Sequence, residues 1–189
     1  RRHRALEGLT RRMSADVTKP EQEALLRLRA EDPEDMAVIA ACLQDAVVLR
    51  SDMTYLAKQR RFAMVVSRYC WEADPAIDPT RARRSGRPVA PGRGRRTRAG
   101  LHVDGVLKVD TLGFDPSGAE PALALLTIVT EPQEDGGAVL LFMFAGGAIL
   151  RLSVECIDCH VTDIGPSWET PRQPRHPLDE TAAPRQERP

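Results

Sequence analysis

The chain has 189 residues, with 27 Lys and Arg against 27 Asp and Glu, and 42% of its residues are hydrophobic. This composition is typical of a globular domain and excludes a collagen-like chain, a wholly disordered chain and a small disulfide-stapled scaffold. The zero net charge argues against a strongly basic nucleic-acid protein, taken as a whole. Four cysteines in a chain of this length make no disulfide framework, which favours a reducing, cytoplasmic location.

The distribution of apolar residues predicts one folded domain between two disordered ends. Residues 24–168 form the domain, residues 1–23 an N-terminal extension and residues 169–189 a proline-rich tail. Residues 73–99 are rich in arginine, proline and glycine, which predicts a flexible insertion. The longest apolar stretch, residues 138–150, is too short to span a bilayer, so we expect no membrane association.

The first elements in chain order are a short strand over residues 25–28 and a helix. Asp32 suits the N-cap of this helix and Pro33 its first position. Apolar residues then recur at i, i+3, i+4 and i+7, so the helix buries one stripe and ends near residue 45. These residues are Met36, Ile39, Ala40 and Leu43.

The sequence of the rest of the domain predicts strands. We expect them over residues 47–50, 53–56, 62–71, 101–109 and 123–130, followed by a hairpin. The run 123–130 is almost wholly apolar, which suggests burial on both faces. The fold class is therefore α+β, with one N-terminal helix packed on a mainly antiparallel sheet or partly closed barrel of about eight strands.

The hairpin is centred on Gly146-Gly147, because two glycines supply the positive φ angles of a two-residue turn. This turn pairs Phe144 with Ile149 and Met143 with Leu150. One face then forms core: Val139, Leu141, Met143, Leu150, Leu152 and Val154. The other face either lies under the helix or forms a contact surface, with Phe142, Phe144 and Arg151 as its candidate residues.

Cys156-Ile157-Asp158-Cys159-His160 matches the C-x-x-C-H pattern of c-type haem attachment, and Cys156, Cys159 and His160 are also zinc-ligand types. Either use requires both thiols on one side of the backbone. The alternation of residues 157–162 instead predicts a strand, in which residues three apart point to opposite faces. Buried cysteine is the favoured interpretation, a metal or haem protein the less favoured alternative, and we predict no cofactor and no metal site.

Eight arginines lie within 18 residues that contain no acid. Such a segment can follow the phosphates of a nucleic acid, without sequence specificity because no aromatic residue lies among them. Residues 79–103 carry a net charge of +8 and residues 104–169 one of −9, so the domain itself is the favoured electrostatic partner. The candidate polyanion contacts are Arg81, Arg83, Arg84, Arg87, Arg93, Arg95, Arg96 and Arg98.

Catalytic motifs are missing from the sequence. There is no phosphate-binding glycine loop between a strand and a helix, no G-x-S-x-G and no H-E-x-x-H. His102 and His160 are the only histidines of the predicted domain, and no motif supports a catalytic pairing between them. We therefore predict no catalytic residue and a non-catalytic domain that binds a protein partner. Weak nucleic-acid binding through Arg81–Arg98 is the alternative.

Several segments together resemble a known family. They are residues 43–48, the run from Asp52-Met53 through Arg60-Arg61-Phe62 to Trp71-Glu72, residues 144–157 and Thr162 to Trp168. The set is similar to the alphaproteobacterial family catalogued as domain of unknown function 2948, over most of residues 25–168. Cys156 fits the family pattern, whereas Cys159 and His160 depart from it. The resemblance implies a small cytoplasmic bacterial protein and transfers no catalytic residue.

Overall fold

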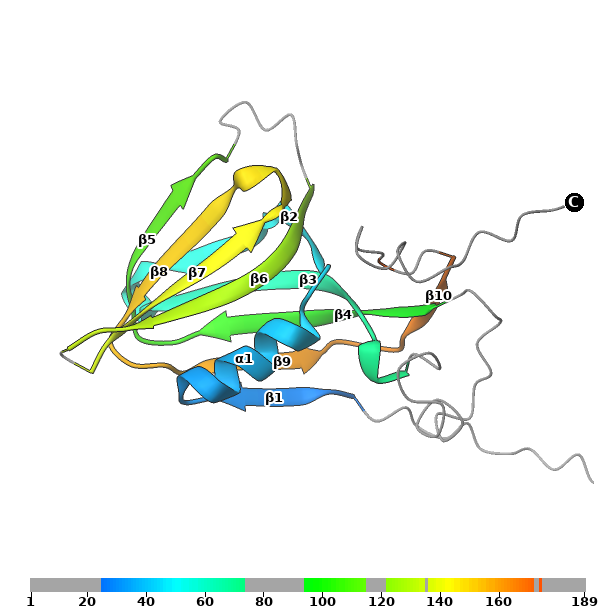
Figure 1. Cartoon of the computed structure of the whole chain (residues 1–189), viewed down its shortest axis with the longest axis horizontal. Coiled ribbons are helices and arrows are strands. Elements are labelled where there is room, and N and C mark those ends of the chain that lie inside the picture. Colours follow the sequence, from blue (N-terminus) through cyan, green and yellow to red (C-terminus); the bar gives the residue numbers. More distant parts are fainter. Residues whose placement is uncertain (1–24, 74–93, 115–121, 135, 172–173, 175–189) are drawn as a thin grey trace, which may run out of the picture.

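The computed structural model describes residues 25–73, 94–114, 122–134, 136–171 and 174. In these ranges the chain forms one helix, α1 (Pro33–Cys42), and one ten-stranded antiparallel sheet that does not close (Figure 1). The strand order is β1-β9-β4-β3-β2-β6-β7-β8-β5, and β10 pairs with β4 beside this path. The strands are β1 (Arg27–Ala30), β2 (Val47–Leu56), β3 (Arg61–Tyr69), β4 (Gly94–Val103), β5 (Val106–Leu112), β6 (Ala122–Pro132), β7 (Ala138–Phe144), β8 (Ile149–Val154), β9 (Cys159–Asp163) and β10 (Trp168–Thr170).

The expectation of about eight strands was too low for two reasons. It missed β10, and it took residues 101–109 as one strand. The structure divides this run into β4 and β5 at a turn where Gly105 adopts a φ of +68°. The backbone N–H of Glu155 donates to the Gly105 carbonyl at 2.9 Å, which holds the turn against the end of β8. In the other direction, the two strands predicted over residues 47–50 and 53–56 are one strand, β2, with a register shift between Val48 and Met53.

Helix α1 forms for the local reasons that the sequence predicts. Asp32 caps it, with its Oδ1 accepting from the Asp35 backbone N–H at 2.8 Å, and Pro33 stands in the first turn. The apolar stripe is buried, and α1 packs against β1 and β6. Helix and sheet are thus joined through one apolar face, as expected.

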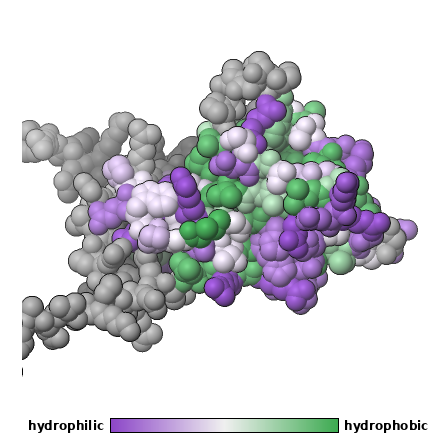
Figure 2. Space-filling model, turned by 180° about the vertical axis from the view of Figure 1, so that it is seen from behind, coloured by the Kyte–Doolittle hydropathy of each residue, from purple (hydrophilic) through white to green (hydrophobic). Residues whose placement is uncertain are grey.

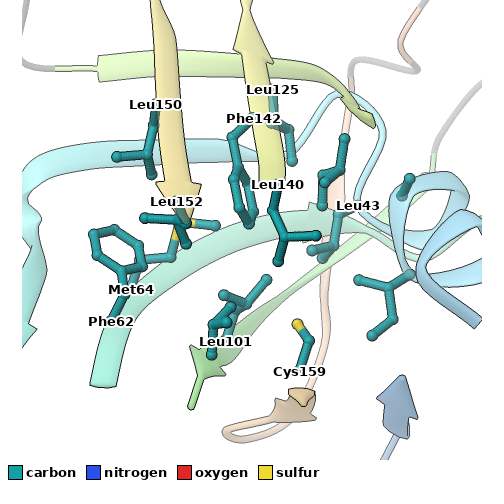
Figure 3. Close-up of a cluster of buried hydrophobic side chains, with 14 of the residues drawn as sticks. Leu43, Phe62, Met64, Leu101, Leu125, Leu140, Phe142, Leu150, Leu152 and Cys159 are labelled. Carbon is teal, nitrogen blue, oxygen red and sulfur yellow. The ribbon is translucent and has the colours of Figure 1, made fainter. Parts of the chain in front are cut away.

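Both halves of the sheet contribute to one core. Figure 3 shows Leu150 and Leu152 of β8 facing Phe62 and Met64 of β3, with Leu43 beside Leu140 at the helix end. All of these side chains are at most 3% exposed. The sheet therefore folds over itself, and each half presents its other face to solvent.

The hairpin register differs from the prediction by one residue. The turn is a three-residue loop, Ala145–Gly147, and it pairs Phe142 with Leu150. A shift of one residue moves every side chain of a strand to the other face of the sheet. The rings of Phe142 and Phe144 are therefore in the core, 0% and 1% exposed, and Arg151 lies on the opposite face. The predicted contact surface of these three residues does not form.

A buried arginine connects distant parts of the chain. The side chain of Arg68 is 1% exposed and donates twice to Asp163, at 2.8 Å for both bonds. It also donates to both carboxylate oxygens of Glu72, at 3.1 and 2.7 Å. Asp163 accepts in addition from the backbone N–H of Leu26 at 2.9 Å. Burial lowers the pKa of Arg68, but the hydrogen bonds to Asp163 and Glu72 outweigh burial and raise it overall.

The last part of the predicted insertion is a strand. β4 begins at Gly94, which packs so closely against Tyr69 that an added Cβ would lie 2.0 Å from the Tyr69 Oη. The backbone N–H of Cys70 donates to the Arg95 carbonyl at 2.9 Å. Residues 94–99 therefore belong to the sheet and not to a flexible loop. The preceding part of the insertion, residues 74–93, lies outside the described residues.

Two neighbouring substitutions test the register of the hairpin. Phe142→Ala removes a buried ring and should lower the free energy of unfolding by about 3–5 kcal/mol. Met143→Ala, at a position 37% exposed, should change it by no more than about 0.5 kcal/mol. Urea denaturation of the two variants measures both values, and a larger loss for Met143→Ala would contradict the register.

The buried arginine allows a second comparison. Arg68→Met leaves Asp163 and Glu72 without their cation, which should destabilise the fold by about 3–5 kcal/mol. Arg61→Met is the matched control, because Arg61 holds Asp104 in a similar two-bond contact but is 41% exposed. It should cost about 1 kcal/mol or less in the same thermal or urea titration. Equal losses in both variants would show that burial of Arg68 is unimportant.

Candidate functional site

The solvent-facing side of β6, β7, β8 and β5 carries apolar residues at neighbouring positions. One cross-strand row runs Thr127, Met143, Ile149 and Leu112, and the next runs Val129, Leu141, Arg151 and Asp110. Leu112, Val129 and Met143 are 67%, 38% and 37% exposed. We call the five apolar members of these rows the outer apolar patch: Leu112, Val129, Leu141, Met143 and Ile149.

The outer apolar patch departs from the usual pattern of a half-buried sheet. Antiparallel strands with one face in a core ordinarily turn polar residues to solvent. Single exposed apolar residues are common, and Figure 2 shows hydrophobic residues interspersed with hydrophilic ones on the side seen from behind. Here five apolar side chains lie side by side on four successive strands. Leu112, Val129 and Met143 are exposed, whereas Leu141 and Ile149 are half-buried. Neighbouring exposed apolar side chains of this kind are typical of an interaction site.

Arg151 lies within the outer apolar patch and is partly engaged. Its Nη1 donates to Asp110 Oδ2 at 3.4 Å and to Ser153 Oγ at 3.1 Å. Lys108 Nζ lies 2.8 Å from Asp110 Oδ1, and this hydrogen bond holds the pKa of Asp110 below its ordinary value. Within the described residues both hydrogen bonds of Arg151 are donated by Nη1. Nε and Nη2 can therefore donate to a carboxylate of another molecule.

The other half of the sheet brings the two histidines together on its solvent side. His102 of β4 is the direct cross-strand partner of His160 of β9, and the rings stack with centroids 4.7 Å apart. His160 Nε2 lies 3.0 Å from Asp158 Oδ1, and His102 Nε2 lies 3.8 Å from Asp104 Oδ2. The sequence could not show this pairing, since it depends on the β4–β9 register. Among the described residues, no three His, Cys, Asp or Glu side chains are grouped to hold a metal ion.

The charges around the histidines favour the neutral form of His102. Burial lowers the pKa of His102 most, and the charges of Arg61 and His160 lower it further against the opposing effect of Asp104 and Asp158. Arg61 holds Asp104 through bonds of 2.6 and 2.8 Å, which lowers the pKa of Asp104.

The residues of the C-x-x-C-H motif have different surroundings. Cys159 opens β9 with its thiol in the core, 0% exposed, and burial raises its pKa to about 12. Cys156 is exposed in the turn between β8 and β9. The strand predicted over residues 157–162 is confirmed only from Cys159 onward, because β8 ends at Val154 and β9 begins at Cys159. A ligand shared by the two thiols would have to enter the core, so this geometry does not fit haem or zinc on the three motif residues.

The described arginines of the predicted polyanion site divide by burial. Arg95 is 4% exposed and donates to the Ser167 hydroxyl and carbonyl at 2.6 and 2.9 Å. Arg96 donates to the carbonyls of Ser67 and Asp45 at 2.9 and 3.3 Å. Only Arg98 of these three is exposed. The other five, Arg81, Arg83, Arg84, Arg87 and Arg93, lie outside the described residues.

The outer apolar patch was missed because its strands are apolar on both faces. The sequence predicted burial on both faces for residues 123–130, but Leu126 and Val129 of β6 are 43% and 38% exposed. The signal was nevertheless present. Strands β6 and β7 stay apolar on their second face, where Val139 is covered at 3% exposed but Val129 and Met143 remain 38% and 37% exposed.

The described part of the chain is thus an open antiparallel sheet with one α-helix packed against it, and its solvent side carries the outer apolar patch. The chain belongs to the family described as a protein of unknown function, DUF2948, which matches residues 26–176. No curated protein and no solved structure matches the chain. In the part of the chain that the structure describes, no helix is long and apolar enough to cross a membrane.

The lowered pKa of His102 predicts a pH dependence of stability. Below the ordinary value of 6.5 the unfolded chain binds a proton that the folded chain still excludes, so the free energy of unfolding falls as the pH drops through this value. Urea denaturation at about pH 7 and about pH 5 should show this fall for the wild type and a smaller fall for His102→Gln. The Asp104 carboxyl affects the free energy of unfolding only at lower pH, because its pKa is lowered from an ordinary value of 3.8. The same fall in both proteins would contradict the assignment.

Proposed function

We propose that this chain is a non-catalytic protein-interaction domain that binds its partner through the outer apolar patch. One observation carries the proposal: five apolar side chains from β5, β6, β7 and β8 are contiguous on the solvent side of a sheet whose other side is already filled by core. Covering such a surface removes apolar area from water, which is the main driving force of protein association. This surface differs from the one expected from the sequence, because Leu141 and Met143, not Phe142 and Phe144, share the face of Arg151.

Arg151 sets the chemistry of the partner. Its side chain is 43% exposed beside an apolar surface, and water is excluded there once a partner binds. Charge-assisted hydrogen bonds are about twice as strong as neutral ones in such places. We therefore expect a partner surface that is apolar at its centre and carries a carboxylate opposite Arg151.

Nucleic-acid binding has less support as a second function. Arg95 and Arg96 bind hydroxyl and carbonyl oxygens of the domain itself and are not available to phosphates.

A cytoplasmic location belongs to the proposal, and it is supported by the four cysteines, which are all free thiols.

A charge placed in the outer apolar patch tests the proposal. The full chain serves as bait in an extract of its source cells, with Met143→Glu as the patch variant. Val65→Glu is the control, since Val65 has a similar exposure of 36% but lies on the other half of the sheet. We expect a partner that the wild type and Val65→Glu retain and Met143→Glu loses. The dissociation constant of the purified pair should rise at least about 30-fold for Met143→Glu, as for a central contact.

The result that overturns the proposal is equally concrete. If every retained protein binds Met143→Glu and the wild type alike, the outer apolar patch is not the interface. Thermal unfolding of the three proteins accompanies the measurement, so that loss of a partner is not confused with loss of fold.

A further inference from the structure

The free edge of β5 is a second feature for which the fold provides no use. β5 is the last strand of the sheet, and within the described residues only β8 pairs with it. Its first residue is satisfied on the free side, because the Val106 N–H donates to the Arg60 carbonyl and the Tyr55 hydroxyl donates to the Val106 carbonyl. From Leu107 onward the strand runs along the margin of the molecule (Figure 1).

An unpaired strand edge is a template for another strand. Its backbone N–H and C=O groups are satisfied by water or by an added chain. Leu107 and Leu112, at the two ends of the free part, are 53% and 67% exposed. A strand added along this edge would cover both of them and continue the ladder that ends at β5.

The charges of β5 identify which strand fits. Lys108 and Asp110 stand on the same face of β5 and form an ion pair of 2.8 Å. In an antiparallel pair about a two-fold axis, residues that face each other lie on the same side of the sheet. When the axis passes through Val109, Lys108 of each copy lies opposite Asp110 of the other. An axis at Lys108 or at Asp110 sets like charges opposite each other, which is unfavourable.

We propose that two copies of this chain associate through β5, antiparallel and centred on Val109. The two sheets then form one continuous sheet, and Lys108 and Asp110 of both copies form a group of four alternating charges. This contact uses the strand edge and, of the outer apolar patch, covers only Leu112, so it does not depend on the proposed function. It does place two such patches on adjoining parts of one sheet, where a two-fold symmetric partner can bind both.

Charge reversal gives a sharp experiment, read by light scattering after gel filtration. The wild type should have about twice its chain mass of 20.9 kDa at about 100 µM. Lys108→Asp gives a β5 with two acids and Asp110→Lys one with two bases. Each variant alone should dimerise at least about 10-fold more weakly, because like charges then face each other. The equimolar mixture should recover the dimer, and so should the double variant Lys108→Asp/Asp110→Lys. Arg27→Asp, a reversal at an exposed site on β1 at the other end of the strand order, should leave the dimer intact.

Three results overturn the pairing. One is a monomeric wild type at this concentration, and another is a mixture that stays monomeric although both variants retain their circular dichroism. The third is a dimer that Met143→Glu dissociates and the charge variants do not, which would place the contact on the outer apolar patch. A monomeric wild type that still retains a partner through Met143 would refute the dimer alone and leave the proposed function standing.

Discussion

The buried guanidinium of Arg68 is the contact on which the arrangement of the sheet depends. Arg68 belongs to β3 and Asp163 to β9, and β4 lies between these strands. The cross-strand neighbours on β4 are Thr97 and Ala99, whose small side chains leave room for Arg68 to reach across the strand on the core side. The Asp163 carboxylate also accepts a hydrogen bond from the backbone N–H of Leu26. One charged group thus fixes the start of the domain, two strands and the turn at Glu72. Its desolvation is offset by four charge-assisted hydrogen bonds.

The features that the sequence could predict are those decided by neighbouring residues. The cap at Asp32, the proline that follows it and the apolar stripe of α1 all act within a few residues, and the helix is where they indicate. The hairpin register was not decided locally. Gly146-Gly147 fits a two-residue turn and a three-residue loop equally well, and the burial of Phe142 and Phe144 selects the second. The pairs Arg68–Asp163 and His102–His160 join residues far apart in the chain, so no spacing in the sequence could reveal them.

The candidate surface depends on the same one-residue difference. The expected surface of Phe142, Phe144 and Arg151 does not form, and the proposed one has Leu141 and Met143 beside Arg151 instead. Arginine content alone was also a poor guide. Arg95 and Arg96 belong to a predicted loop, yet both lie in β4 and bind oxygens of the domain, because a long side chain beside a strand end can satisfy carbonyls that the ladder leaves open.

The close approach of Gly94 to Tyr69 has a consequence for engineering of the chain. The Cys70–Arg95 hydrogen bond and the β3–β4 ladder hold the two flanks of residues 74–93 together, whatever lies between them. Closing a longer connection between fixed ends costs little, about 0.6 kcal/mol for each doubling of its length. A fluorescent reporter inserted between these two flanks therefore has both of its ends held in place by the sheet.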